Sequence, residues 1–260
     1  MPMLDAVAAV GRGTLGVVRG TGGVALFGAE GLSHLLRPPF YAREFWRAFI
    51  EFAYFSLPVV AMTAVFSGMV IALQSYTGFS RFSAESAIPG VVALSVVREL
   101  GPVLAGLMVS GRVGAAMAAE LGTMRVTDQI DALGTLSTNP MKYLVAPRLL
   151  AGTVALPLLV VVADIIGVAG GFLISTVKLG FNPSGYITNT ANILTTNDVV
   201  SGLCKAAVFG FLIALMGCYH GYHSRGGAQG VGSATTSAVV SSSILILAFD
   251  YVLTELFFAR

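Results

Sequence analysis

The segment 98-RELGP-102 places an arginine beside a glutamate within an apolar stretch. A charged side chain in the middle of a membrane helix costs roughly 2.5 to 3.5 kcal/mol on insertion scales, unless it is paired or faces a water-filled cavity. Adjacent helical residues point about 100° apart, so Arg98 and Glu99 should need partners from another helix or from a ligand. A buried ion pair and a substrate contact both fit this pattern, and they are not exclusive. Gly101 and Pro102 predict a local break, where freed backbone groups can line a cavity.

Two further acids, Asp164 and Asp250, fall inside apolar segments. Intramembrane acids either carry protons or belong to ion pairs. No intramembrane histidine stands near them in the sequence to complete a proton relay. Pairing with Arg98 or Lys205, or exposure to water, is therefore the favoured interpretation.

The segment 117-MAAELGTMRVTDQIDAL-133 lies between two long apolar regions. Its charged residues are Glu120, Arg125, Asp128 and Asp131. Written as one helix, residues 120–133 place Met124, Asp128 and Asp131 on one face, and Gly122 and Gly134 permit sharp turns at its ends. The pattern predicts either an ordinary solvated loop helix or a helix that a partner grips.

The chain has no motif for binding nucleotide phosphates. A P-loop needs Gly-Lys followed by Ser or Thr, and none of Lys142, Lys178 and Lys205 follows a glycine. If the protein transports a substrate, the energy comes from an ion gradient or from a separate ATPase on the cytoplasmic side. A compact cytoplasmic helix is what such an ATPase would hold.

Other candidate sites are weak. Cys204 and Cys218 lack metal or disulfide spacing and are expected to be packing residues. His220 and His223 fit an interfacial pair better than a metal site, since no further ligand lies nearby. No catalytic arrangement is suggested, so we expect no catalytic residue, no metal and no cofactor on this chain. A net charge of +2 without basic tracts does not suggest nucleic-acid binding.

The composition is that of an all-α polytopic membrane protein. Hydrophobic residues make up 55% of the 260 residues, and charged residues only 11%. A membrane helix needs about 20 apolar residues. The apolar stretches predict five spans, at about 52–80, 88–119, 149–177, 199–219 and 233–258.

The first 55 residues form a separate N-terminal part in this prediction. Residues 1–35 suit a helix lying in the membrane interface, and Pro38 and Pro39 end it. Residues 40–55 carry charges on one helical face and aromatic side chains, including Trp46, on the other, as is typical of a membrane boundary. We therefore divide the chain into residues 1–55, with interfacial and elbow helices, and residues 56–260, the five-span domain.

Lysine and arginine are unequally shared between the two sides of the predicted bundle. One side has Arg12, Arg19, Arg37, Arg43, Arg47, Arg112, Arg125, Lys142, Arg148 and Arg225. The other has Arg81, Lys178 and Arg260. The positive-inside rule makes the first side cytoplasmic, with the N-terminus cytoplasmic and the C-terminus on the opposite side.

Long runs of the sequence resemble the MlaE-like permeases, the membrane subunits of ABC lipid transporters that work with MCE-domain proteins. The resemblance is carried by 67-SGMVIALQSY-76, by 94–133 with its RELGP and AAELGTMRVTDQIDAL motifs, by 139-NPMKYLVAPR-148 and by 233-SATTSAVVSSSILILAFDYVLT-254. It implies a non-catalytic homodimer in the bacterial inner membrane that moves phospholipid between the inner and outer membranes. The implied partners are a cytoplasmic ATPase, which binds the ATP and Mg, a periplasmic MCE-domain protein and a small cytoplasmic STAS-type subunit.

The same resemblance implies roles for individual residues. Residues 120–133 would be the coupling helix, with Glu120, Met124, Arg125, Asp128, Gln129 and Asp131 toward the ATPase. The lipid cavity, at the dimer axis, would be lined by Ile71, Gln74, Tyr76, Gly78, Phe82 and Arg98. An intramembrane polar network would include Arg98, Glu99 and Asp250. Asp164 has no role in this interpretation.

Two alternatives remain open from the sequence. One is a proton-driven secondary transporter with Glu99, Asp164 and Asp250 as carriers, although five spans are few for that class. The other is a scaffold that anchors a cytoplasmic enzyme without transporting anything.

Overall fold

The structure is a computed structural model that describes residues 2–35 and 37–259. Every regular element in these two ranges is helical. The α-helices are α1 (Pro2–Leu35), α2 (Ala42–Ala53), α3 (Leu57–Phe79), α4 (Ile88–Ser95), α5 (Gly101–Val109), α6 (Ala115–Val126), α7 (Gln129–Thr135), α8 (Ala146–Val177), α9 (Pro183–Ile193), α10 (Thr196–Tyr222) and α11 (Gly227–Phe258). This confirms the all-α prediction.

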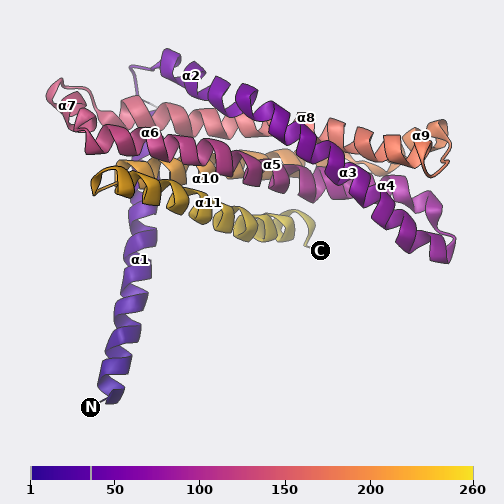
Figure 1. Cartoon of the computed structure of the whole chain (residues 1–260), viewed down its shortest axis with the longest axis horizontal. Helices are drawn as coiled ribbons and strands as arrows, with labels where there is room; N and C mark the ends of the chain where they lie inside the picture. The colour runs from indigo at the N-terminus through magenta and orange to yellow at the C-terminus, as the bar shows by residue number, and fades with distance from the viewer. Residues whose placement is uncertain (1, 36, 260) are drawn as a thin grey trace.

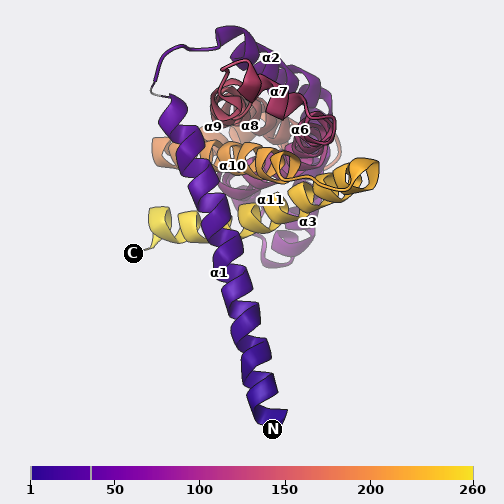
Figure 2. The same ribbon diagram turned by 90° about the vertical axis from the view of Figure 1, so that its left-hand side faces the viewer.

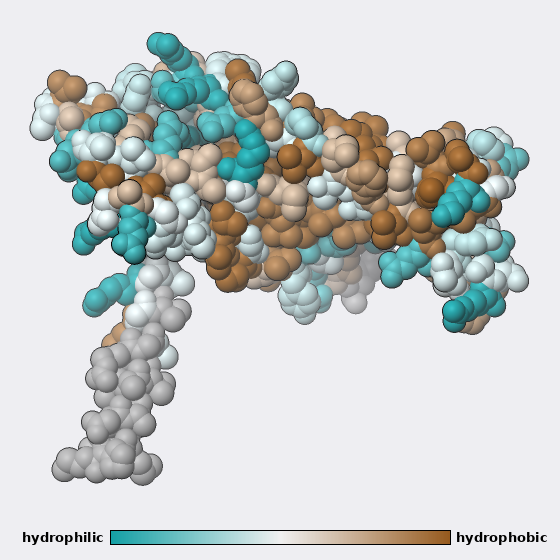
Figure 3. Space-filling model, in the orientation of Figure 1, coloured by the Kyte–Doolittle hydropathy of each residue, from teal (hydrophilic) through white to brown (hydrophobic). Residues whose placement is uncertain are grey.

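Five helical segments are long and apolar enough to cross a membrane, as the sequence predicted. They cover Ala42–Phe82, Glu85–Val126, Met141–Val177, Thr196–Tyr222 and Gly227–Phe258. Each is longer than predicted. In the first three, short turns of 3-10 or π-helix join or extend α-helices into one continuous segment, whereas the last two are the single helices α10 and α11. Figure 3 shows hydrophobic residues in a broad belt along the long axis, with hydrophilic residues gathered toward the two ends. The chain is a multi-pass membrane protein.

The connections between spans lie at the two ends of the bundle. Figure 1 shows α7 at one end and α9 at the opposite end. α9 begins where Asn182 accepts hydrogen bonds from the backbone N–H groups of Ser184 and Gly185, and Pro183 suits the first helical turn. The sequence analysis did not anticipate this short helix. It folds beside α8 and α4 and returns the chain to α10.

α1 leaves the bundle near the α7 end and runs steeply across the direction of the spans (Figures 1 and 2). A helix that crosses the spans in this way runs parallel to the membrane surface, as an interfacial helix would. The interfacial role of α1 remains a prediction. Phe27 is buried against Tyr219 and Tyr222 of α10 and against His223, which follows that helix, and these contacts fix the C-terminal half of α1. Two arginines used in the charge count, Arg12 through its side chain and Arg260 entirely, lie outside what the structure describes.

α8 forms the centre of the bundle, with α2 and α3 on one side and α10 on the other. The helices approach closely where glycines face each other. A Cβ atom built on Gly68 of α3 would lie only 1.9 Å from the carbonyl oxygen of Gly167 in α8. Similarly, a Cβ on Gly210 of α10 would lie 2.1 Å from the carbonyl oxygen of Gly152. Small residues allow this close contact between membrane helices.

We expect Gly68→Ala to destabilise the protein by about 1–3 kcal/mol, because the added methyl group must push two backbones apart. Thermal unfolding of the detergent-purified protein measures the effect. Gly78→Ala in the same helix is the control, since nothing lies within 4 Å of its Cβ position. Equal unfolding temperatures for the two variants would contradict close packing at Gly68.

Candidate functional site

A cavity of about 390 Å³ lies between the far end of α3 and α4. It is lined by Ile71, Gln74, Ser75, Gly78, Phe79, Phe82, Val91 and Ser95. The first six follow the i, i+3, i+4, i+7 spacing of one helical face, which is why they meet. Four of the six residues predicted to bind lipid are among them: Ile71, Gln74, Gly78 and Phe82. Phe82 is 81% exposed at the mouth.

The structure places the other two predicted lipid residues outside this lining. Tyr76 is two positions from Gln74 and from Gly78, so it points to the opposite side of α3. There its ring meets Phe181 edge-on, with 6.2 Å between centroids, and packs beside Ala72 and Ile88. Arg98 lies on the π-helical turn Val96–Leu100 and is held by another helix.

Arg98 forms an ion pair with Asp198 at the start of α10. Its Nη2 and Nε lie 2.6 Å and 2.7 Å from Asp198 Oδ1, and the guanidinium lies 4.3 Å from the ring centroid of Phe258. Asp198 Oδ2 also accepts hydrogen bonds from the backbone N–H and the hydroxyl of Thr195. Asp198 was not among the predicted site residues. Its signal was 195-TTND-198, the Thr-x-x-acid spacing of a capping box.

Lys205 is fully buried and pairs with the two remaining acids of this region, Glu99 and Asp250. Its Nζ lies 2.6 Å from Glu99 and 3.0 Å from Asp250, and it donates to the Thr254 hydroxyl at 2.7 Å. Arg98 and Glu99 therefore have different partners, as their divergent directions require. Asp198 and Lys205 are seven residues apart on α10, so one face of that helix supplies both.

The helix does not break at Gly101 and Pro102, contrary to the expectation from sequence. It continues from Glu85 to Val126 through π-helical turns at Val96–Leu100 and Ser110–Gly114. Pro102 has no N–H group, which leaves the Arg98 carbonyl without its usual helical donor. Lys205 Nζ lies 3.1 Å from that carbonyl and donates to it. The freed backbone group thus binds the lysine instead of lining a cavity.

The predicted coupling segment is two helices rather than one. α6 ends at Val126, and α7 starts at Gln129 after Asp128, which has a left-handed backbone with φ of 57°. The turn is therefore at Asp128, while Gly122 lies buried within α6. Arg125 forms a 2.6 Å ion pair with Asp131, which ties α7 back to α6.

The predicted coupling residues differ in how accessible they are. Asp128, Gln129 and Asp131 are exposed at the end of the bundle. Met124 is partly buried against the core. Glu120 pairs with Arg148 at 2.8 Å and lies 3.7 Å from Arg47, so it joins α6 to α8 and α2.

Of the alternatives predicted for Asp164, an ion pair with Arg98 or Lys205 or exposure to water, the ion pair is absent within the described residues. Arg98 and Lys205 are engaged elsewhere, and within the described ranges Asp164 Oδ1 is buried without a hydrogen-bond partner. It faces Gly101, where a Cβ atom would lie 2.0 Å from this oxygen. The missing side chain at Gly101 is what leaves room for the carboxyl group.

Five spans around a buried charge network, a cavity near one end and a charged two-helix turn at the other are features of a membrane permease. The profile of the family described as Permease MlaE matches residues 45–256. The chain belongs to the MlaE permease family, and it is an ABC transporter permease.

Named relatives cover most of the chain. A probable ABC transporter permease protein of Rickettsia felis is 57% identical over 256 residues, which are 98% of this chain and 99% of the relative. The intermembrane phospholipid transport system permease protein MlaE of Haemophilus influenzae is 34% identical over 78% of each chain. The protein TRIGALACTOSYLDIACYLGLYCEROL 1 of Arabidopsis thaliana chloroplasts is 40% identical over 78% of this chain and 58% of its own.

Proposed function

We propose that this chain is the inner-membrane subunit of a transporter that moves phospholipid between the inner and outer membranes. The supporting observation is the cavity between α3 and α4, which combines apolar walls with a few polar groups. Ile71, Phe79 and Val91 suit acyl chains, and Gln74 and Ser95 offer hydrogen bonds to a phosphate or an ester. The name of the Haemophilus relative, which includes phospholipid transport, favours this substrate.

In this proposal Arg98 is a phosphate ligand only after a conformational change. Its guanidinium is bound by Asp198, and its side chain is 34% exposed. A lipid phosphate would have to displace Asp198 to form the paired hydrogen bonds that arginine favours. We further propose that a second copy of the chain closes the open side of the cavity, where Phe82 is exposed.

The α7 end is the proposed docking site for the ATPase. Asp128, Gln129 and Asp131 are exposed there, and Leu136 is 74% exposed beside them. The ATP and Mg would be held by the ATPase, because this chain has no P-loop. This end would then be cytoplasmic, together with the N-terminus and any STAS-type subunit. The MCE-domain protein would lie at the α9 end, on the side of the C-terminus.

A proton-driven mechanism is less well supported by the contacts. Glu99 and Asp250 both pair with Lys205, so two of the three candidate carriers already share a cation. Of the three candidates, only Asp164 lacks an ion-pair partner in the part of the chain that the structure describes.

Purification in mild detergent, with mass spectrometry of the proteins and lipids recovered, tests the proposal. We expect a P-loop ATPase, an MCE-domain protein and bound phospholipid. A chain that purifies alone, free of lipid, and transports in vesicles without ATP until a protonophore is added would contradict it. Recovery of a cytoplasmic enzyme without lipid would favour the scaffold alternative.

Filling the cavity should reduce lipid binding. Gly78 lines it and has nothing within 4 Å of its Cβ position, so Gly78→Trp can enter the cavity without displacing neighbours. We expect bound phospholipid per protein to fall on the order of tenfold, the effect of about 1.4 kcal/mol. The control is Val70→Trp, on α3 but outside the lining, where Val70 is 57% exposed. Equal lipid content in the two variants would place the lipid elsewhere.

A further inference from the structure

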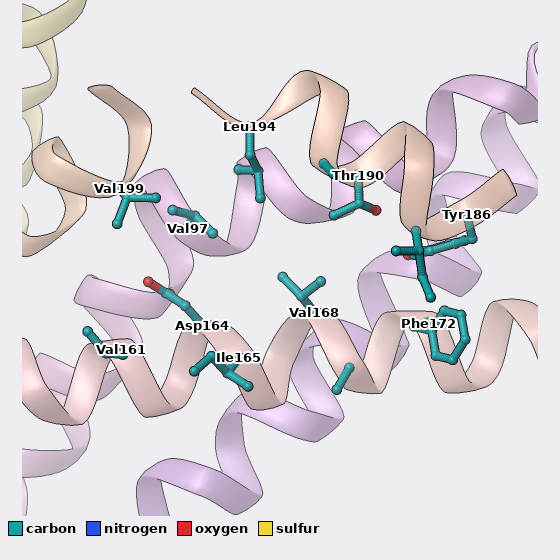
Figure 4. A pocket seen from close by; sticks show the side chains of 13 residues that line it. Val97, Val161, Asp164, Ile165, Val168, Phe172, Tyr186, Thr190, Leu194 and Val199 are labelled. Atoms are coloured by element: carbon teal, nitrogen blue, oxygen red, sulfur yellow. The ribbon is translucent and has the colours of Figure 1, made fainter. Parts of the chain in front are cut away.

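A second and larger cavity, of about 560 Å³, lies between α8 and α9 (Figure 4). It is separate from the cavity between α3 and α4, with no lining residue in common. Thirteen residues line it, and ten of them are aliphatic or Phe: Val97, Val161, Ile165, Val168, Ala169, Phe172, Ile187, Ala191, Leu194 and Val199. Only Asp164, Tyr186 and Thr190 bring polar side-chain groups.

Two of these three polar side chains, Asp164 and Thr190, have a buried oxygen that lacks a hydrogen-bond partner within the described part of the chain. The atoms are Asp164 Oδ1 and Thr190 Oγ1, whereas the Tyr186 hydroxyl can bond to Ser175 of α8. Buried polar atoms are normally satisfied, so two exceptions in one cavity call for a partner that binds there. Figure 4 shows Asp164 and Tyr186 toward opposite ends, with Ile165 and Val168 between them on α8. Such a cavity suits an elongated apolar molecule with a polar end.

The cavity is reached from the apolar outer surface of the bundle. Ile165 and Ile187 in its lining are 66% and 59% exposed, and Val199 is 38% exposed. An apolar mouth on a membrane span faces lipid, so the ligand must come from the bilayer. An α-helix of a partner is about 10–12 Å across with its side chains and would cover the mouth rather than fill the cavity.

We propose that this cavity binds a membrane amphiphile with one long alkyl chain and a hydroxyl group in its head. The hydroxyl would donate to Asp164 Oδ1, and the chain would lie along Ile165, Val168 and Phe172. The apolar lining forms one path between Asp164 and Tyr186, so a cavity of about 560 Å³ suits one alkyl chain rather than the two of a diacyl phospholipid. A lysophospholipid has the required donor in its glycerol hydroxyl, and a protonated fatty acid has it in its carboxyl O–H. This site does not depend on the transport proposal.

Photolabelling of membranes that contain the full-length protein tests the site. The probes are a monoacyl phosphatidylethanolamine, a fatty acid and a diacyl phosphatidylethanolamine, each with a diazirine in one acyl chain. Labelled peptides from α8 and α9 are then measured by mass spectrometry. We expect a single-chain probe to label them at least about tenfold more than the diacyl probe. The single-chain probe that labels α8 and α9 more strongly shows whether the ligand is a lysophospholipid or a fatty acid.

Two pairs of variants locate the label. Ala169→Trp fills the cavity, whereas Leu158→Trp adds the same side chain on α8 outside the lining, where Leu158 is 52% exposed. Labelling should be lost in the first and kept in the second. Asp164→Leu should lower labelling about tenfold, and Asp164→Asn should retain more because its amide oxygen still accepts a hydrogen bond.

Labelling that persists in Ala169→Trp, or equal labelling by the diacyl probe, would overturn the proposal. The same holds if a partner protein is cross-linked at α8 and α9 in place of lipid. If Asp164→Leu fails to insert into the membrane, Ala169→Trp and Leu158→Trp still test whether the ligand occupies the cavity. Neither Ala169 nor Leu158 is fully buried, so both variants should fold.

Discussion

Replacing Lys205 with methionine should destabilise the protein by about 3–5 kcal/mol, the cost of removing one partner from a buried ion pair. Methionine keeps the length of the side chain but leaves Glu99 and Asp250 without their shared cation. It also removes the donor to the Arg98 carbonyl, which Pro102 has left without a helical partner. A loss of this size is a large part of the 5–15 kcal/mol by which proteins are typically stable.

The amount of folded protein in the membrane and its unfolding temperature in detergent measure this effect. Lys178→Met is the matched control, because Lys178 is an exposed lysine just beyond the end of α8. A triple variant with Lys205→Met, Glu99→Gln and Asp250→Asn should recover much of the stability, since no unpaired charge remains. A single Lys205→Met variant as stable as Lys178→Met would show that the network does not hold the helices together.

Replacing Asp128 with arginine should lower ATP-driven lipid transport by at least about tenfold while the membrane domain stays folded. This expectation rests on the proposed docking of the ATPase at the α7 end. Asp128 is exposed at the turn between α6 and α7, and a reversed charge at the centre of an interface commonly costs 2 kcal/mol or more. The measurement is transport and ATPase co-purification with the reconstituted complex.

The backbone conformation at Asp128 requires its own control. Asp tolerates a left-handed conformation better than Arg does, so part of any effect could arise from strain at φ of 57°. Ser83→Arg introduces the same side chain at an exposed residue with φ of 51°, beyond α3 at the opposite end of the bundle, and so reproduces the backbone strain without reversing a charge. Equal loss of transport in both variants, or normal ATPase association in Asp128→Arg, would refute the docking proposal.

Four of the six lipid-binding residues implied by the family resemblance line the cavity between α3 and α4. Residues 71, 74, 78 and 82 share a helical face, so their meeting follows from helix geometry alone. The same geometry excludes Tyr76, which the family resemblance had placed with them. The capping-box spacing of Thr195 and Asp198 was also readable, but it did not reveal that Asp198 would bind Arg98 across the bundle.

The sequence by itself determined that the chain is an all-α polytopic membrane protein with five spans. It also determined that the charged turn lies between the second and third spans. These follow from apolar length and helical period, which depend only on residues near one another in the chain. The tertiary structure decided which acid pairs with which base, and that Asp164 pairs with no base among the described residues. Partners about a hundred residues apart, such as Arg98 with Asp198 and Glu99 with Lys205, meet where α10 packs against the Val96–Leu100 turn. Gly202 allows this contact, because a Cβ atom there would lie 2.4 Å from the Val97 carbonyl oxygen. The cavity that contains Asp164 forms for a similar reason: α9 folds back beside α8, and Gly101 leaves space for the carboxyl group.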